Sequence, residues 1–160
     1  MSVQTSAPLP IFENLDLRQM ALIEPLFVPL EYQEGETIFM QGEAAEYLYL
    51  VAEGEISIQY KPEDGPALVV ARIRQDGVVG WSAALGSPVY TSSAVCSAPS
   101  SRLLRVRGDD LRTLCENHPE TGSLLLERLA AMIAVRLRNT HEHVIALLQL
   151  GLKITQTAAS

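Results

Sequence analysis

Residues 34–80 read EGETIFMQGEAAEYLYLVAEGEISIQYKPEDGPALVVARIRQDGVVG, a series of short β-rich runs separated by turn residues. At each break a glycine follows Glu, Gln or Asp, and glycine reaches positive φ cheaply where an antiparallel chain must reverse. Working outward from this stretch, we expect strands at 27–31, 37–40, 47–52, 55–60, 68–73, 90–97 and 102–106. About seven or eight strands at this spacing predict a sandwich or barrel with jelly-roll connections.

Helical patterns lie on both sides of these strands. Apolar residues recur near helical spacing in residues 12–26, which predicts one or two short helices. After the last strand, Asp109 is expected to cap a short helix that reaches Glu116. From Pro119 to Leu150 only Gly122 interrupts the pattern, so we expect one helix of about 30 residues.

The sequence therefore predicts an α+β fold: an antiparallel β-roll or jelly roll of about eight strands, with short N-terminal helices and a long C-terminal helix. Residues 12–150 are expected to form one domain, between a flexible arm at 1–11 and a tail at 151–160. A chain of 160 residues with 48% apolar residues suits a single globular domain.

Composition narrows the classes of partner and compartment. A net charge of −7 disfavours nucleic acid and anionic membranes as partners. No stretch has the pattern of a signal peptide or a membrane span. Cys96 and Cys115 form no disulfide framework, which fits a reducing environment. We therefore expect a cytoplasmic protein without direct membrane contact.

The long helix carries two apolar stripes. One is a seam with alternating steps of four and three, as in a coiled coil: Leu126, Ala130, Ile133, Leu137, Thr140, Val144 and Leu147. The other, Leu125, Leu129 and Met132, lies on a different face. Either a single amphipathic face packs the helix on the roll, or the second stripe does so and the seam meets the identical helix of a partner. We expect the second arrangement, a homodimer.

Several motifs together resemble a known family. They are Glu34-Gly35-Glu36, Gln41-Gly42-Glu43, Tyr49-Leu50-Val51 with Glu53-Gly54, Asp76-Gly77-Val78-Val79-Gly80, and the helical run from Arg136 to Val144. With a short helix after the last strand and a long helix after that, the chain resembles the cyclic nucleotide-binding domain of the catabolite activator family of regulators. The resemblance covers about residues 12–148, nearly the whole chain.

The resemblance implies a phosphate-binding cassette that begins at Gly80. In the family, a Glu just after this glycine holds the ribose hydroxyl, and an Arg about ten residues later pairs with the cyclic phosphate. Here Trp81 stands where the family has Glu, and the Arg position falls on Tyr90 or Thr91. Residues 77–101 contain no Asp, Glu, Lys or Arg, so the cassette itself cannot make the ion pair.

An uncharged pocket remains as the candidate ligand site, with residues from the cassette and from the long helix. Its members are Gly80, Trp81, Ser82, Ala83, Thr91, Ser92, Ser93, Thr140 and His141. Three interpretations stay open. The domain senses another small ligand; it is a ligand-free scaffold in which Trp81 fills the ribose pocket; or it binds cAMP or cGMP through an Arg from outside the cassette, such as Arg72, Arg74 or a helix Arg of a partner chain.

The same residues indicate a regulatory module rather than an enzyme. No nucleophile and base recur with a third orienting residue, so no catalytic residues are predicted. Cys115, His118, His141 and His143 do not form a convincing metal site, because the last two point to different helix faces. Only residues 151–160 follow the long helix, too few for a helix-turn-helix, so we expect no direct DNA binding. The expected cofactor is none, or a cyclic nucleotide or other small ligand, and the expected signal passes through the C-terminal helix to an unknown protein partner.

Overall fold

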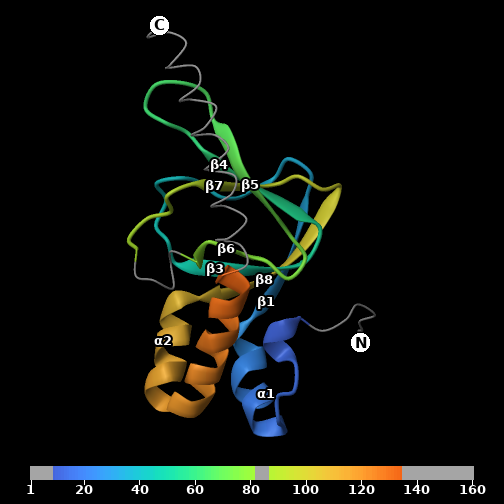
Figure 1. Ribbon diagram of the computed structural model, residues 1–160, viewed down its shortest axis with the longest axis vertical. Coiled ribbons are helices and arrows are strands. Elements are labelled where there is room, and N and C mark those ends of the chain that lie inside the picture. Colours follow the sequence, from blue (N-terminus) through green and yellow to red (C-terminus); the bar gives the residue numbers. More distant parts are fainter. Residues whose placement is uncertain (1–8, 82–86, 135–160) are drawn as a thin grey trace, which may run out of the picture.

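The computed structural model of the chain describes residues 9–81 and 87–134 (Figure 1). It begins with η1 (Pro10–Phe12), α1 (Leu17–Ile23) and η2 (Glu24–Leu26), and the strands are followed by α2 (Gly108–Asn117). The C-terminal helix starts at residue 119 and is described as far as residue 134. Figure 1 shows these helices gathered at one end of a β-roll, against the sheet that contains β1, β3 and β8.

Eight strands form the roll within the described residues. They are β1 (Val28–Gln33), β2 (Thr37–Phe39), β3 (Tyr47–Glu53), β4 (Glu55–Tyr60), β5 (Leu68–Arg74), β6 (Val78–Val79), β7 (Ser93–Cys96) and β8 (Ser100–Arg107). Two antiparallel sheets result, with strand orders β1-β8-β3-β6 and β2-β7-β4-β5. The predicted fold class is confirmed.

Two strand predictions need correction. Strand β6 was not predicted, because its two residues, Val78 and Val79, are too short a run to show alternation. The strand predicted at 90–97 begins only at Ser93, and Tyr90 lies before it. The backbone N–H of Tyr90 donates to Glu43 O at 2.9 Å, and its C=O accepts from Gly42 N at 2.8 Å. These two bonds hold Tyr90 against the turn between β2 and β3.

The helix after β8 also begins earlier than predicted. Arg107, not Asp109, is the N-cap residue, and it makes no side-chain cap hydrogen bond. The N–H of Gly108 donates to Glu46 O at 2.9 Å, and this contact starts the helix next to β3. Asp109 lies in the first turn, where its carboxylate is favoured by the helix dipole and pairs with Arg107 and Arg112.

The core consists of two clusters. One fills the interior of the roll between the two sheets. The other joins the helices to the sheet of β3 and β8, and it includes Leu9 and Ile11. Residues 9–11 are therefore packed, although the sequence analysis placed them in the flexible arm. Burial of apolar surface contributes a favourable free energy of roughly 25 cal/mol per Å², and this contribution holds the N-terminal segment against the roll.

The two stripes of the C-terminal helix have different environments. Leu125, Leu129 and Met132 are buried in the cluster that joins the helices to the roll, as predicted for the second stripe. In the seam, Leu126 is 45% exposed and Ala130 is exposed, whereas Ile133 is partly buried against the same cluster as the second stripe. Leu137, Thr140, Val144 and Leu147 lie outside the described residues. Among the described helices, none combines the length and hydropathy that crossing a bilayer requires.

Candidate ligand site

The candidate site forms where β6 ends at Gly80. The chain turns there with φ of 75°, in the left-handed region that favours glycine. A Cβ at this position would lie 3.0 Å from Tyr47 O and 3.1 Å from Phe39 Cε2. The backbone at the start of the cassette therefore packs directly against the aromatic interior of the roll.

Tyr90 occupies the roll interior at one of the positions where the resemblance implies an arginine. Its side chain is only 4% exposed, and its ring stacks on Phe39 with centroids 3.8 Å apart. The hydroxyl donates to Tyr47 O at 2.6 Å and accepts from Tyr47 N at 3.1 Å. Tyr90 is thus fixed at both ends of its side chain, by stacking and by two hydrogen bonds to β3.

The other aromatic side chains keep this interior uncharged. Burial raises the pKa values of Tyr49 and Tyr90 above the usual tyrosine range, although the hydrogen bond to Tyr47 partly opposes the shift at Tyr90. Arg105 stands opposite Tyr49 in the register of β3 and β8, so it projects from the same face of the sheet, with its guanidinium 4.3 Å from the centre of the Tyr47 ring. The aromatic cluster itself consists of neutral side chains, and Arg105 lies beside it.

The cavity that remains at the site is small, about 70 Å³. Its described lining consists of Phe39, Ile58, Gly80, Trp81, Tyr90, Thr91 and Ser92, none of which is charged. Pockets that bury a ligand of drug size have volumes of about 300–1,000 Å³. Among the described residues, this cavity offers neither the space nor the cation that a cyclic nucleotide phosphate requires.

The structure brings together only part of the predicted site. Gly80, Trp81, Thr91 and Ser92 line the cavity, whereas Ser93 uses its hydroxyl to accept from Gln41 N at 2.8 Å. Ser82, Ala83, Thr140 and His141 lie outside the described residues. Phe39 and Ile58 also line the cavity, although they were not predicted as site residues. The available signal was the alternation of inward and outward side chains along each strand.

Trp81 links the site to the helical end of the molecule. Its side chain is partly buried against the cluster that also contains Leu125, Leu129 and Met132 of the C-terminal helix. The same cluster includes Val78 of β6. A displacement of the chain at Gly80 and Trp81 would therefore change the packing of the surface that the C-terminal helix contacts.

Arg72 and Arg74, considered above as cations for this site, lie on the outer face of β5. Ile73 between them is buried in the roll interior, so its neighbours point outward. Arg74 Nε donates to Glu55 Oε2 at 2.9 Å, and Arg72 Nε lies 3.7 Å from Glu55 Oε1. A hydrogen bond from Ser97, together with these arginines, lowers the pKa of Glu55 despite some burial. Within the described residues, neither arginine lines the small cavity.

No group of three His, Cys, Asp or Glu side chains gathers into a metal site in residues 9–81 and 87–134. Cys115 contacts Gly122, where an added Cβ would lie 2.8 Å from its Sγ, so this thiol packs between α2 and the C-terminal helix.

Comparisons with known proteins match this fold. A family model described as the cyclic nucleotide-binding domain matches residues 29–118. A candidate potassium channel protein of Rhodopseudomonas palustris is 33% identical over 113 residues, which are 71% of this chain and 27% of that protein. The CRP-like cAMP-activated global transcriptional regulator of Mycobacterium tuberculosis is 25% identical over 134 residues, 84% of this chain and 58% of the regulator.

Among solved structures, the catabolite activator protein of Thermus thermophilus superposes with a TM-score of 0.66 and 28% identity. The match covers 86% of this chain and 62% of that one. The chain spans between about a quarter and about three-fifths of the length of the two curated relatives described above.

Proposed function

The chain belongs to the cyclic nucleotide-binding domain family, and we propose that it is a non-enzymatic regulatory module of that family whose cassette has lost its affinity for cyclic nucleotides. The proposal includes a cytoplasmic homodimer that signals through its C-terminal helix to a protein partner. A ligand other than a cyclic nucleotide stays compatible with it, provided that the ligand needs no cation in the cassette.

The buried Tyr90 carries this proposal. Its ring and its hydroxyl take the space and the hydrogen bonds at a position where the family resemblance implies a phosphate-binding arginine. Hydrogen bonds to charged groups contribute about 1.5–3 kcal/mol each. Loss of a bidentate arginine contact therefore corresponds to a loss of two or more orders of magnitude in affinity for a cyclic phosphate.

The packing of Trp81 supports the route of the signal. Because Trp81 and the C-terminal helix contact one core cluster, a partner that rearranges either element changes the free energy of the other. In this proposal the cassette acts as a fixed structural element, and the helix presents the surface that the partner reads.

A titration of the full chain with cAMP and with cGMP tests the lost affinity. We expect no saturable change in Trp81 fluorescence, the signal of the one tryptophan, and no calorimetric heat up to about 1 mM nucleotide. The variant Trp81→Phe supplies the blank for inner-filter effects. Saturable binding at micromolar nucleotide, seen by calorimetry, would show that a cation from elsewhere completes the site and would overturn the proposal.

The homodimer is tested at the exposed part of the seam. Leu126→Glu places a charge on a side chain that is 45% exposed, so the folded monomer should tolerate it. We expect sedimentation equilibrium to give a dimer for the native chain and a shift toward monomer for Leu126→Glu. Leu68→Glu, at a 49% exposed position on β5, is the matched control and should leave the mass unchanged. A native chain that sediments as a monomer contradicts the dimer.

A further inference from the structure

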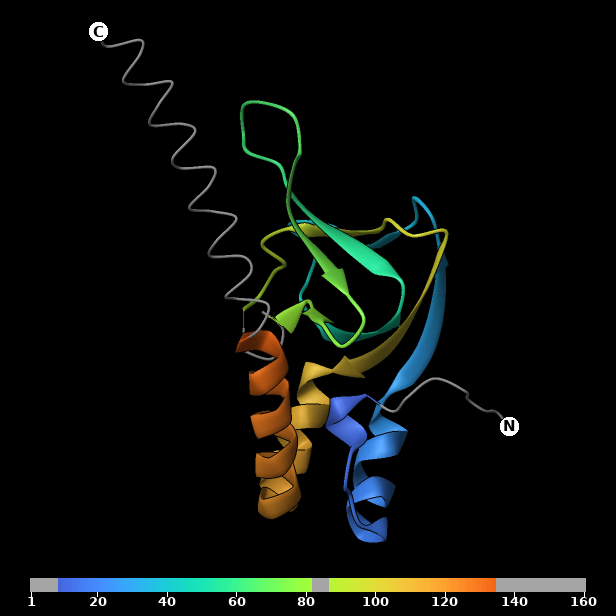
Figure 2. The same ribbon diagram turned by 45° about the vertical axis from the view of Figure 1, so that its right-hand side comes forward.

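A second and larger cavity lies between the roll and the C-terminal helix, and the described residues that line it are different from those of the cassette cavity. Its volume is about 510 Å³, within the usual range of sites for small molecules. One wall is the segment Arg72–Gly77, which ends β5 and turns toward β6. The opposite wall is the C-terminal helix, through Arg128, Ala131 and Met132, and Pro10 closes one side. Figure 2 shows β6 and the preceding turn beside the last described turns of this helix.

The charged groups of this cavity are mainly cationic. Arg72, Arg74 and Arg128 line it, with Asp76 as the one carboxylate among its described lining residues. This concentration of guanidinium groups contrasts with a whole chain of net charge −7. Local positive charge in an acidic protein selects for anions at that place.

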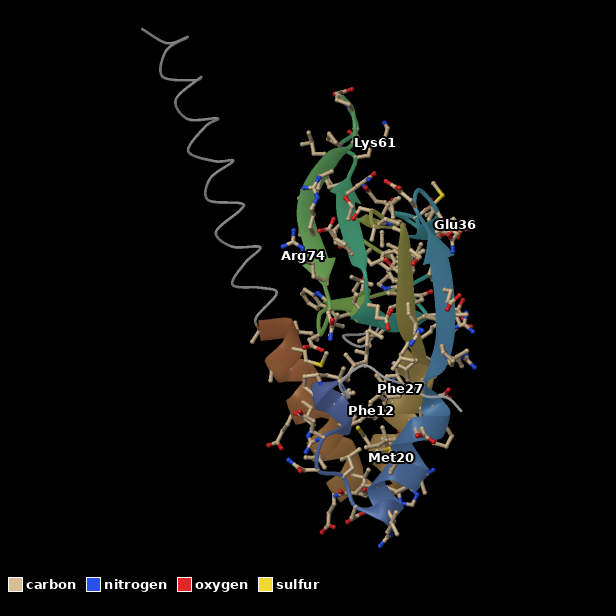
Figure 3. All side chains as sticks on the ribbon, turned by 90° about the vertical axis from the view of Figure 1, so that its right-hand side faces the viewer. Phe12, Met20, Phe27, Glu36, Lys61 and Arg74 are labelled. Carbon is tan, nitrogen blue, oxygen red and sulfur yellow. The ribbon has the colours of Figure 1, made fainter. Side chains whose placement is uncertain are left out.

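Arg74 is the cation best placed to receive a ligand. Its side chain is 75% exposed, and Figure 3 shows it on the outer side of β5. Within residues 9–81 and 87–134, its Nε donates to Glu55 at 2.9 Å and its terminal amino groups make no other hydrogen bond. A guanidinium has five N–H donors, so its terminal amino groups keep the fork geometry that suits a carboxylate or a phosphate.

Arg128 has a different task. Its Nη1 donates to the carbonyl oxygens of Pro10 and Ile11, each at 3.3 Å, and to that of Glu13. It therefore ties the N-terminal segment to the C-terminal helix and fixes one side of the cavity. Its positive charge still contributes to the potential inside.

Apart from Gln75 and Gly77, the rest of the described lining is apolar. Pro10, Ala131 and Met132 form this surface next to the arginines, and Ala131 is its exposed member, whereas the side chain of Ile73 points into the roll. A cavity with a few placed polar groups against an apolar wall is the usual form of a small-molecule site. A purely ionic ligand would leave this wall in contact with water.

We propose that this cavity binds a small organic anion with an apolar body. The anionic group, a carboxylate or a phosphate monoester, contacts Arg74 and Arg72, and the apolar body lies on Pro10, Ala131 and Met132. Such a ligand contacts the roll and the C-terminal helix at once, so its binding stabilises their association. The proposal is independent of the cassette and does not rest on the function proposed above.

Three probes that share a six-carbon skeleton and differ in their head group test the site: hexyl phosphate, hexanoate and hexan-1-ol. Each is titrated to 10 mM into the full chain labelled with ¹⁵N, and backbone amide shifts are followed. We expect saturable shifts centred on residues 72–77 and 128–132 with at least one of the two anions, which identifies the head group, and weaker shifts with the alcohol. Failure of both anions to bind, or equal binding of the alcohol, would overturn the proposal.

Variants distinguish the contribution of the Arg74 charge to anion binding from that of the cavity volume. Arg74→Gln should weaken anion binding about fivefold, because it removes one charged contact at an exposed mouth. Arg102→Gln, whose side chain is 43% exposed and pairs with Glu53 away from the cavity, should leave affinity unchanged. Ala131→Phe fills the cavity and should abolish binding, whereas Ala134→Phe, on an exposed position outside the lining, should not. Unchanged affinity in both Arg74→Gln and Ala131→Phe would falsify the assignment.

Discussion

The cavity at Gly80 and the cavity beside the C-terminal helix have volumes of about 70 and about 510 Å³, and their linings differ in kind. In the first, buried aromatic side chains close the space where the family resemblance implies a charged ligand site. In the second, arginines stand at an open mouth over an apolar wall. Family membership thus locates a site, whereas the side chains around it decide what it binds.

The difference between the two cavities also distinguishes residues needed for folding from residues needed only for binding. Tyr90 closes the small cavity from inside the core, so its loss must affect folding. Arg74 stands at the large cavity on the surface, so its loss should affect binding alone. Substitutions at these two positions test that distinction, and their expected effects on stability differ several-fold.

Tyr90→Ala should have the largest effect. Removing a buried aromatic ring leaves a cavity, and such changes typically cost about 3–5 kcal/mol in the free energy of unfolding. Urea denaturation followed by circular dichroism measures this cost. A loss below about 1 kcal/mol would mean that Tyr90 is not part of the packed interior.

Tyr90→Phe is the matched control, because it keeps the ring that stacks on Phe39 and removes only the hydroxyl. The N–H and C=O of Tyr47 then lose a partner, which should cost about 1–3 kcal/mol. Neither variant should gain affinity for cAMP, since none of the described lining residues supplies a cation. If Tyr90→Phe bound cAMP at micromolar concentration, the Tyr90 hydroxyl alone would account for the lost affinity for nucleotide.

The neutral interior also predicts loss of stability at high pH. Burial is the largest cause that raises the pKa values of Tyr32, Tyr49 and Tyr90 in the folded chain. Below pH about 10 these tyrosines are protonated in both states, so their contribution to stability is complete. Above pH about 10 the unfolded chain releases protons that the folded chain retains. Stability should then fall by up to about 1.4 kcal/mol per pH unit for each such tyrosine.

Urea midpoints at pH 8.5, 10 and 11 measure this dependence, and absorbance at 295 nm follows the phenolates directly. Tyr49→Phe removes one of the three groups and should flatten the decline. If the midpoint is constant from pH 8.5 to 11, the tyrosines of the roll interior are accessible to solvent.

The fold could be predicted because turn residues and strand alternation are local signals. Glycines such as Gly42 and Gly54 do have positive φ, at 92° and 96°, and they follow predicted strands or turns. The two-residue strand β6 was missed because it is too short to carry a pattern. The start of α2 was misplaced because the contact of Gly108 with Glu46 depends on residues more than 60 positions apart.

The two cavities were less predictable than the fold, because they depend on contacts between residues that are far apart in the sequence. Residues 77–101 carry no charged side chain, and none of the described lining residues of the small cavity is charged. Nothing local indicated that Tyr90 would stack on Phe39 or bond to Tyr47. The larger cavity joins three segments, near residues 10, 74 and 128, so it exists only once the chain is folded.

Arg74→Gln should have the smallest effect on stability, although it is expected to weaken anion binding. Exposed ion pairs contribute about 0.2–1 kcal/mol, and Glu55 keeps its hydrogen bond from Ser97 and its contact with Arg72. We therefore expect the free energy of unfolding to change by less than about 1 kcal/mol, close to the change in Arg102→Gln measured in the same urea series. A loss of more than about 2 kcal/mol would make Arg74 a structural residue like Tyr90, and the contrast between the two cavities would fail. A small loss means that any weakened anion binding in this variant comes from the missing guanidinium and not from a damaged fold.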